Sequence, residues 1–100
     1  MSATEDLNPV KVEQAIRECS NRIGRGVQVC AERYAAFLEA DHALDLAFAR
    51  AYVQATGPAH ERKYTAELET ESQRAARDVA DAAYRHAERQ AKALDAELRA

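Results

Sequence analysis

Thr56-Gly57-Pro58-Ala59 interrupts a sequence that otherwise has a helical pattern over most of its length. Glycine readily adopts the left-handed conformation that ends many helices, and proline is tolerated in the first turn of a helix but not in its interior. These residues therefore predict that one helix ends at residue 55, that a turn covers residues 56–59, and that a second helix runs from 59 to 99. Because so short a turn leaves its two helices as antiparallel neighbours, we expect a helical hairpin.

The segment before the turn has the apolar period of a single long helix. Asn8 is a preferred N-cap and Pro9 suits the first helical position, so we expect a helix over 9–55, a hairpin domain over 8–100 and a disordered tail over 1–7. Gly24 and Gly26 each cost about 1 kcal/mol relative to alanine in a helix interior, so a kink at 24–26 is conceivable. We favour a continuous helix, because apolar residues recur every seven positions on both sides of the glycines: Ile16, Ile23, Cys30, Phe37, Leu44 and Ala51.

The segment after the turn repeats an apolar residue every three or four positions, as a helix with one apolar face does. If the chain folds back at residues 57 and 58, position i faces roughly position 115 minus i, so Tyr52 faces Tyr64 and Asp41 faces Arg74. A carboxylate between two helices is costly unless it is paired, so we expect a buried ion pair of Asp41 and Arg74. The predicted helix–helix interface consists of Ile16, Ile23, Val27, Cys30, Tyr34, Phe37, Leu44, Phe48, Tyr52, Tyr64, Leu68, Val79, Leu94 and Leu98.

The apolar residues are too small to give an isolated hairpin a large core. Alanine accounts for 23 of the 100 residues, whereas Leu, Ile, Val, Met and Phe together account for only 18. Alanine buries little apolar area, so a lone pair of helices falls short of offsetting its loss of backbone entropy. We therefore expect an all-α fold, a long antiparallel helical hairpin that dimerises into a four-helix bundle or a coiled-coil-like assembly.

Net charge and hydropathy exclude some classes of partner. The formal charge of −3 gives no global attraction to nucleic acid or to an anionic membrane. No apolar run approaches the roughly 20 residues needed to cross a bilayer, and residues 1–7 lack the pattern of a signal peptide, so the expected location is cytoplasmic. Cys19 and Cys30 would lie about 16 Å apart on one helix, beyond disulfide reach, and are expected to be free thiols.

No residue pattern predicts an enzyme or a cofactor site. Glu39 and His42 have the Glu-x-x-His spacing used by di-iron helical bundles, but further inward-facing glutamates are lacking and His42 lies off the apolar stripe. His60 and His86 have no neighbouring nucleophile arranged for catalysis. We therefore expect no catalytic residues, no metal and no cofactor.

A basic stripe in the second helix is the one candidate for nucleic-acid contact. It is formed by Arg85, Arg89, Lys92 and Arg99. Acidic residues interleave it, and aromatic side chains for base stacking are absent apart from Tyr84. A solvated, ion-paired helix face is therefore the favoured interpretation of this stripe.

Two segments resemble known families. The stretch from Tyr34 to Thr70, with Ala-Phe-Ala-Arg-Ala-Tyr at 47–52, the Thr-Gly-Pro turn and Glu-Arg-Lys-Tyr at 61–64, resembles small helical proteins encoded by tailed bacteriophages of actinobacteria. That resemblance implies a small cytoplasmic phage protein that binds a host protein or a component of phage DNA metabolism, and it supplies no catalytic residues. Tyr84 to Glu88 matches the Tyr-x-x-x-Glu pattern of helical-hairpin proteins exported by type VII secretion, although those proteins carry Trp-x-Gly in the turn and this chain has no tryptophan.

The functional expectation is a non-enzymatic protein–protein interaction module. In this interpretation the chain forms a homodimer and is a phage early protein that binds a host or phage protein, for example a host coiled-coil protein, through its helical surfaces. Two alternatives stay open. The chain is then either an accessory factor in phage DNA recombination or replication, acting through the basic stripe, or a secreted hairpin of the type VII class.

Overall fold

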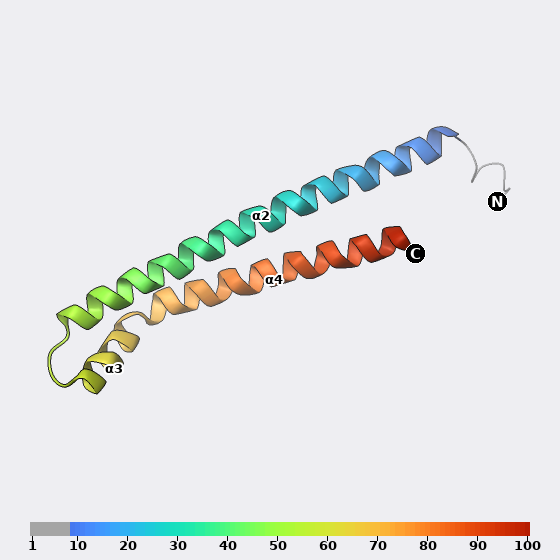
Figure 1. Ribbon diagram of the computed structural model, residues 1–100. Coiled ribbons are helices and arrows are strands. Elements are labelled where there is room, and N and C mark those ends of the chain that lie inside the picture. Colours follow the sequence, from blue (N-terminus) through green and yellow to red (C-terminus); the bar gives the residue numbers. More distant parts are fainter. Residues whose placement is uncertain (1–8) are drawn as a thin grey trace.

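The structure is a computed structural model that describes residues 9–100, and it is helical along nearly all of that range. Its elements are α2 (Pro9–Gln54), α3 (Ala59–Glu69) and α4 (Glu71–Arg99), with no strand among the described residues. α3 and α4 run back along α2, as Figure 1 shows. The all-α fold and the antiparallel hairpin are thereby confirmed. The tail expected over 1–7 and the N-cap expected at Asn8 lie outside the described residues.

The turn between α2 and α3 forms where the glycine and proline predict it. Gly57 has φ +101°, the only positive φ in the described chain, which glycine adopts without the strain that a side chain would suffer. Pro58 has an extended backbone, and its carbonyl oxygen accepts a 3.0 Å hydrogen bond from the amide of Arg62. α2 ends at Gln54, one residue earlier than expected, and the amide of Ala55 still donates to the carbonyl of Ala51.

The glycines at 24 and 26 do not interrupt α2. The helix passes through both as one element of 46 residues. A methyl group added at either position would meet no atom within 4 Å, so neither glycine is required by a close approach within the hairpin.

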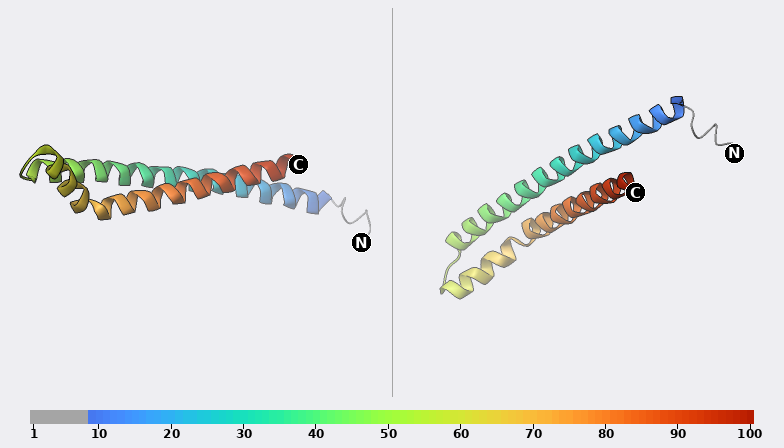
Figure 2. Two further views of the ribbon diagram at one scale, coloured as in Figure 1. Left: turned by 90° about the horizontal axis from the view of Figure 1, so that it is seen from below. Right: turned by 45° about the vertical axis from the view of Figure 1, so that its right-hand side comes forward.

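A break at Thr70 divides the second half of the hairpin, and the sequence pattern does not predict it. Thr70 has φ −105° and ψ 17°, outside the helical range, and α3 and α4 consequently follow different axes (Figure 2). The hydroxyl of Thr70 donates a 2.7 Å hydrogen bond to the carbonyl oxygen of Ala66 and accepts one of 3.3 Å from Arg74 Nη2. Arg74 Nη1 also donates to the carbonyl oxygen of Glu67. Arg74 therefore satisfies a carbonyl group that the end of α3 leaves without its usual helical partner.

The hairpin is a thin rod with very little core. It measures 79 × 17 × 17 Å and exposes 7773 Å² of surface, whereas a compact monomer of 11.1 kDa exposes about 5,700 Å². The buried residues within the described range are few and mostly small: Leu44, Ala51, Ala66, Thr70 and Ala87. The excess of roughly 2,000 Å² follows from this elongated shape, in which most side chains lie at the surface.

Candidate interaction surface

One face of α2, which we name the seam, contacts α3 and α4. Most of the buried and half-buried side chains of α2 lie on this face. Leu44 and Ala51 are buried there, and Cys30 and Phe37 are half-buried. The remaining residues of the predicted helix–helix interface divide into two groups. Phe48, Tyr52 and Leu94 are half-buried, whereas Ile16, Ile23, Val27, Tyr34, Tyr64, Leu68, Val79 and Leu98 are exposed.

The seven-residue repeat leaves the seam gradually toward the start of α2. A straight α-helix drifts by about 20° per seven residues, so positions spaced by seven wind slowly around it. Leu44 is 8% exposed, but Ile23 is 44% exposed and Ile16 is 61% exposed, although all three belong to one repeat. The repeat therefore faces α3 and α4 near the turn and points to the side of the hairpin near its open end.

Exposed and mostly apolar residues on this side of α2 form a continuous row, which we name the lateral stripe. It lies roughly a quarter-turn around α2 from the centre of the seam. Its seven positions are all exposed, and the five large ones are between 44% and 66% exposed. The lateral stripe consists of Ile16, Ser20, Ile23, Val27, Ala31, Tyr34 and Leu38.

Shallow apolar grooves border the lateral stripe. One groove of about 300 Å³ lies between α2 and α4, with Ile23, Val27 and Cys30 on one wall and Leu94 on the other. A second groove of about 370 Å³ continues from Ile23 toward Ile16 and the end of α4 at Leu98. Because the two grooves share Ile23, they follow the stripe along its first half.

The start of α2 extends beyond the end of α4. Arg22 forms a 3.7 Å ion pair with Glu97, so the last turn of α4 lies near Arg22. The first turns of α2 extend beyond it and have no helix opposite them (Figure 1). Val12 and Ile16 lie in this overhang and are 45% and 61% exposed. The overhang adds to the apolar surface that the hairpin leaves uncovered.

The predicted ion pair of Asp41 with Arg74 is wrong, because Asp41 pairs with Arg77. Arg77 Nη1 lies 3.4 Å from Asp41 Oδ1, with both side chains partly exposed, while Arg74 bonds to the break at Thr70. The cause is a shift in register. The numbers of facing residues add up to 114 at the Arg62 contact with Tyr52, but to 118 for Asp41 with Arg77. Since α3 runs obliquely to α2, it advances less along α2 per residue, and one helical turn is lost from the expected pairing.

The same oblique path separates Tyr52 from Tyr64, which the sequence places opposite each other. Arg62 takes the place of Tyr64. Its guanidinium carbon lies 4.6 Å from the centre of the Tyr52 ring, and its Nη2 donates a 3.0 Å hydrogen bond to the Tyr52 carbonyl oxygen. Tyr64 and Leu68 consequently remain exposed on α3, and Val79 is exposed on α4.

A tyrosine pair links the two long helices at the middle of the hairpin. The ring centres of Tyr34 and Tyr84 lie 5.1 Å apart, a favourable distance for a tilted aromatic pair. The hydroxyl of Tyr84 donates a 3.0 Å hydrogen bond to Glu88 Oε2. This bond, with a smaller contribution from burial, raises the pKa of Tyr84 above its ordinary value. Tyr84 and Glu88 thus form a hydrogen bond within α4. Any helix with tyrosine and glutamate four residues apart could form the same bond.

The basic stripe of α4 is partly neutralised by its own helix. Arg85 Nε and Arg99 Nε each lie 3.1 Å from a carboxylate oxygen four residues earlier, on Asp81 and Asp95 respectively. Arg89 and Lys92 are exposed. Since two of the four cations already have anionic partners, the stripe has less charge to offer a phosphate backbone than its sequence suggests.

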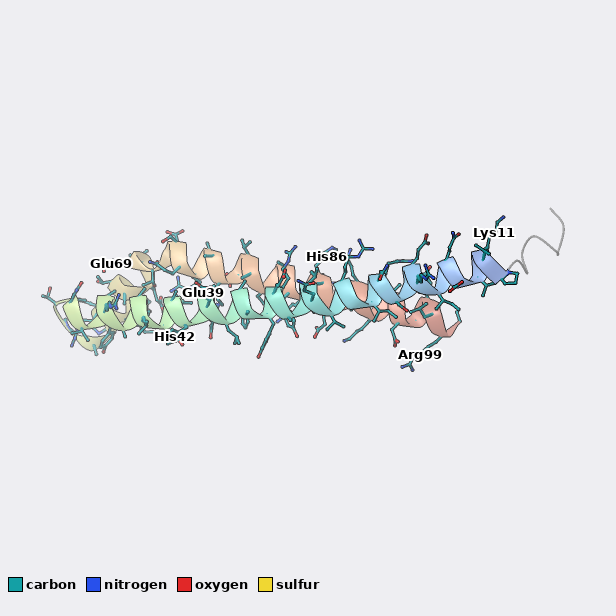
Figure 3. All side chains as sticks on the ribbon, turned by 90° about the horizontal axis from the view of Figure 1, so that it is seen from above. Lys11, Glu39, His42, Glu69, His86 and Arg99 are labelled. Atoms are coloured by element: carbon teal, nitrogen blue, oxygen red, sulfur yellow. The ribbon has the colours of Figure 1, made fainter. Side chains whose placement is uncertain are left out.

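Glu39 and His42, the pair considered for metal binding, lie apart from His86 along the part of the hairpin that the structure describes (Figure 3). Glu39 and His42 are both exposed on α2, and His86 lies on α4 (Figure 3). Across residues 9–100, no group of three or more His, Cys, Asp or Glu side chains is arranged to hold a metal ion. Cys19 and Cys30 are free thiols, as expected.

Comparisons with known proteins give no relative from which a function could be transferred. No family model, no curated protein and no solved structure matches this chain. None of the described helices is both long enough and apolar enough to span a bilayer.

Proposed function

We propose that this protein is a non-enzymatic protein–protein interaction module that associates with other helices through the lateral stripe. The observation that supports this most directly is the stripe itself, a row of exposed and mostly apolar side chains about 33 Å long at 1.5 Å per residue. Contiguous apolar surface of this extent is uncommon on monomeric proteins and marks sites of association.

Burial of the stripe offsets much of the cost of association. Each half-exposed Ile, Val, Leu or Tyr gains about 1 kcal/mol on complete burial, and two such faces together gain roughly 10 kcal/mol. This gain is comparable to the cost of bringing two proteins together, which lies at about 4–15 kcal/mol. Association at micromolar concentrations requires a net gain of about 8 kcal/mol, so contacts between the two hairpins beyond the stripe contribute the rest. We therefore expect a homodimer that forms a four-helix bundle as the basic unit.

The further partner in this proposal is another helical protein, bound by the assembled bundle. The resemblance to small phage proteins supports a host or phage protein as this partner, and supports action in the host cytoplasm as an early protein. A long, thin helical bundle is suited to a coiled-coil partner, because both molecules expose helical ridges and grooves over a similar length.

Light scattering during size-exclusion chromatography over a range of concentrations tests the proposal. The wild-type chain should elute with the mass of a dimer at micromolar concentrations. Val27→Asp should give a helical monomer, because the stripe would then carry a charge at its centre. Val53→Asp is the matched control, since Val53 is 74% exposed on α2 away from the stripe, and it should leave the mass unchanged. A folded wild-type monomer at high micromolar concentration would contradict the proposal.

A further inference from the structure

The lateral stripe has a spacing that reads the same from both ends. Its positions 16, 20, 23, 27, 31, 34 and 38 are separated by four, three, four, four, three and four residues, with Val27 at the centre. An antiparallel copy of the same helix centred on Val27 therefore places every position of the stripe opposite another position of the stripe. A helix of unrelated spacing would not match it in this way.

We propose that two copies of this chain pair antiparallel along α2, with the two-fold axis at Val27. This inference rests on the proposed self-association and specifies its surface, its direction and its register. Such an interface is isologous, which means that the same patch of both copies forms it. Val27 then faces Val27 of the second copy, and the other facing positions are Ile16 with Leu38, Ser20 with Tyr34, and Ile23 with Ala31.

The sizes of the facing side chains favour the antiparallel arrangement. Ser20 faces Tyr34 and Ile23 faces Ala31, so a small residue lies opposite a large one at every level between the centre and the ends. This complementarity lets two helices approach to the usual distance of about 8–10 Å without voids. A parallel pair would instead set Tyr34 against itself and Ala31 against itself, which crowds one level and leaves the next one hollow.

The ends of the stripe are compatible with the same register. The pairing brings Glu13 near Asp41 of the second copy, and like charges in contact would oppose association. Each carboxylate has its own cation, however. Arg17 lies 3.0 Å from Glu13, and Arg77 lies 3.4 Å from Asp41. The acids therefore limit the stripe at both ends without leaving an unpaired charge inside it.

The antiparallel pair also accounts for the overhang at the start of α2. In this register the overhanging turns of one copy lie against the middle of α2 in the other, with Ile16 against Leu38. Because the stripe lies roughly a quarter-turn from the seam, the same axis sets the C-terminal halves of the two α4 helices side by side, so that four helices pack together around the centre of the dimer.

Distances between spin labels on the two copies test the direction and the register. The labels are placed at Gln28→Cys or at His42→Cys, in full-length chains in which Cys19 and Cys30 are replaced by alanine. Both label sites are exposed and lie off the stripe. In an antiparallel pair centred on Val27 the axial separation of equivalent residues grows by about 3 Å per residue from the axis. Labels at 28 should therefore be offset by about 3 Å along the axis and labels at 42 by about 45 Å.

The outcomes separate this inference from the proposed function. A short distance at 28 with a long one at 42 supports the antiparallel pair. Similar short distances at both sites would overturn the inference while leaving self-association through the stripe intact. A dimer that survives Val27→Asp would place the interface elsewhere and overturn both the inference and the proposed role of the stripe. A wild-type chain that is monomeric by light scattering would overturn the proposed function itself.

A cross-linking experiment gives a second measurement that does not depend on spin labels. In the same cysteine-free background, Ile16→Cys and Leu38→Cys chains should each fail to form disulfide-linked dimers on oxidation, and a mixture of the two should form them. A parallel pair would reverse this result, because each variant would then cross-link with itself. Cross-links in the single variants and none in the mixture would overturn the antiparallel register.

Discussion

The half of the hairpin near the turn and the half near its open end are built from similar residues but differ in how well they are packed. Near the turn, Leu44, Ala51, Ala66 and Thr70 are buried, and the hydrogen bonds of Arg62 and Arg74 tie α3 to its neighbours. Near the open end Ala87 alone is buried among the described residues, while the large apolar side chains of α2 face solvent. The turn end therefore has its own stabilising contacts, whereas the open end leaves its large apolar side chains uncovered.

This difference follows from the path of α3. By running obliquely, α3 brings the small side chains Ala66 and Thr70 close to α2 and buries them almost completely, at 0% and 1% exposure. α4 has no comparable device, and Ala87 is its one buried residue. A partner that covers the lateral stripe would make the burial of side chains similar at the turn end and at the open end. Variants that alter only one of these ends therefore test the difference in packing directly.

Leu44→Ala should give the largest loss of stability and should act through the turn end. Removing the one large buried aliphatic side chain of the described hairpin costs about 2 kcal/mol or more, through lost transfer free energy and the cavity left behind. Leu46→Ala is the matched control on the same helix. Leu46 is 44% exposed, so its loss should cost less than about 0.5 kcal/mol. Urea unfolding followed by circular dichroism measures both, and equal losses would show that the turn end has no privileged core.

Alanine substitution of two glycines should have opposite signs in the two halves. Gly57→Ala should destabilise by about 1–2 kcal/mol, because φ +101° is strained for any side chain. The contact of the new methyl group with Glu61 Oε2 is relieved by rotation of that flexible side chain and adds little. Gly24→Ala should stabilise by about 1 kcal/mol, because Gly24 is helical and has open space around it. Thermal unfolding of both variants checks the signs, and a stabilising Gly57→Ala would refute the described turn.

Thr70→Val should cost about 1 kcal/mol, because it keeps the shape of a buried side chain and removes its hydroxyl. Arg74 then loses one acceptor, and the carbonyl oxygen of Ala66 loses a donor. Thr70→Ser, which retains the hydroxyl, should recover part of that loss. A neutral Thr70→Val in urea unfolding would mean that these hydrogen bonds do not stabilise the break.

The ion pair of Asp41 with Arg77, which joins α2 to α4, should have a smaller effect on stability. A double-mutant cycle of Asp41→Asn with Arg77→Met should give a coupling free energy below about 1 kcal/mol, because both side chains are partly exposed and salt screens them. The matched cycle with Arg74→Met should give a coupling near zero. A larger coupling to Arg74 would restore the register that the sequence predicts.

The smallest expected effect concerns the pH dependence of Tyr84. Its raised pKa means that the folded state favours the neutral phenol, so its contribution to stability is present below about pH 10 and is lost as the pH rises through the folded-state pKa. The difference in tyrosinate absorbance between wild type and Tyr84→Phe isolates this titration. Glu88→Gln should move it to lower pH, because the carboxylate that accepts the hydrogen bond is the main cause of the shift. No movement would assign the shift to burial instead.

The sequence predicts the elements of this fold better than their relative placement. Gly57 and Pro58 act locally, so the turn and the two flanking helical segments follow from residue types alone. The break at Thr70 does not, because threonine is tolerated within helices, and the hydrogen bonds of Thr70 to Ala66 and of Arg74 to Glu67 are evident only once the structure is known. A single register through residues 59–99 therefore gives wrong pairings with α2 beyond Thr70. The pairing of Asp41 with Arg77, where that register predicts Arg74, is an example.

The exposed apolar surface can likewise be predicted only in part from the sequence. The sequence identifies the apolar residues of α2, but it merges the seam and the lateral stripe into one interface. The two separate only when the helix is known to be straight, because the seven-residue repeat then drifts around it between Leu44 and Ile16. The exposure of Tyr64 and Leu68 could not be predicted, because it depends on the oblique path of α3 and no local sequence pattern indicates that path.

The shape of the hairpin also determines how it would respond to mechanical tension. The start of α2 and the end of α4 lie at the same end of the rod, opposite the turn (Figure 1). A pulling force applied at these two points separates the helices one turn after another, as in the opening of a zip, instead of sliding them past each other. The first turns to part would be the poorly packed ones, at low force. The greatest resistance would come late, when the separation reaches the oblique segment anchored by Thr70.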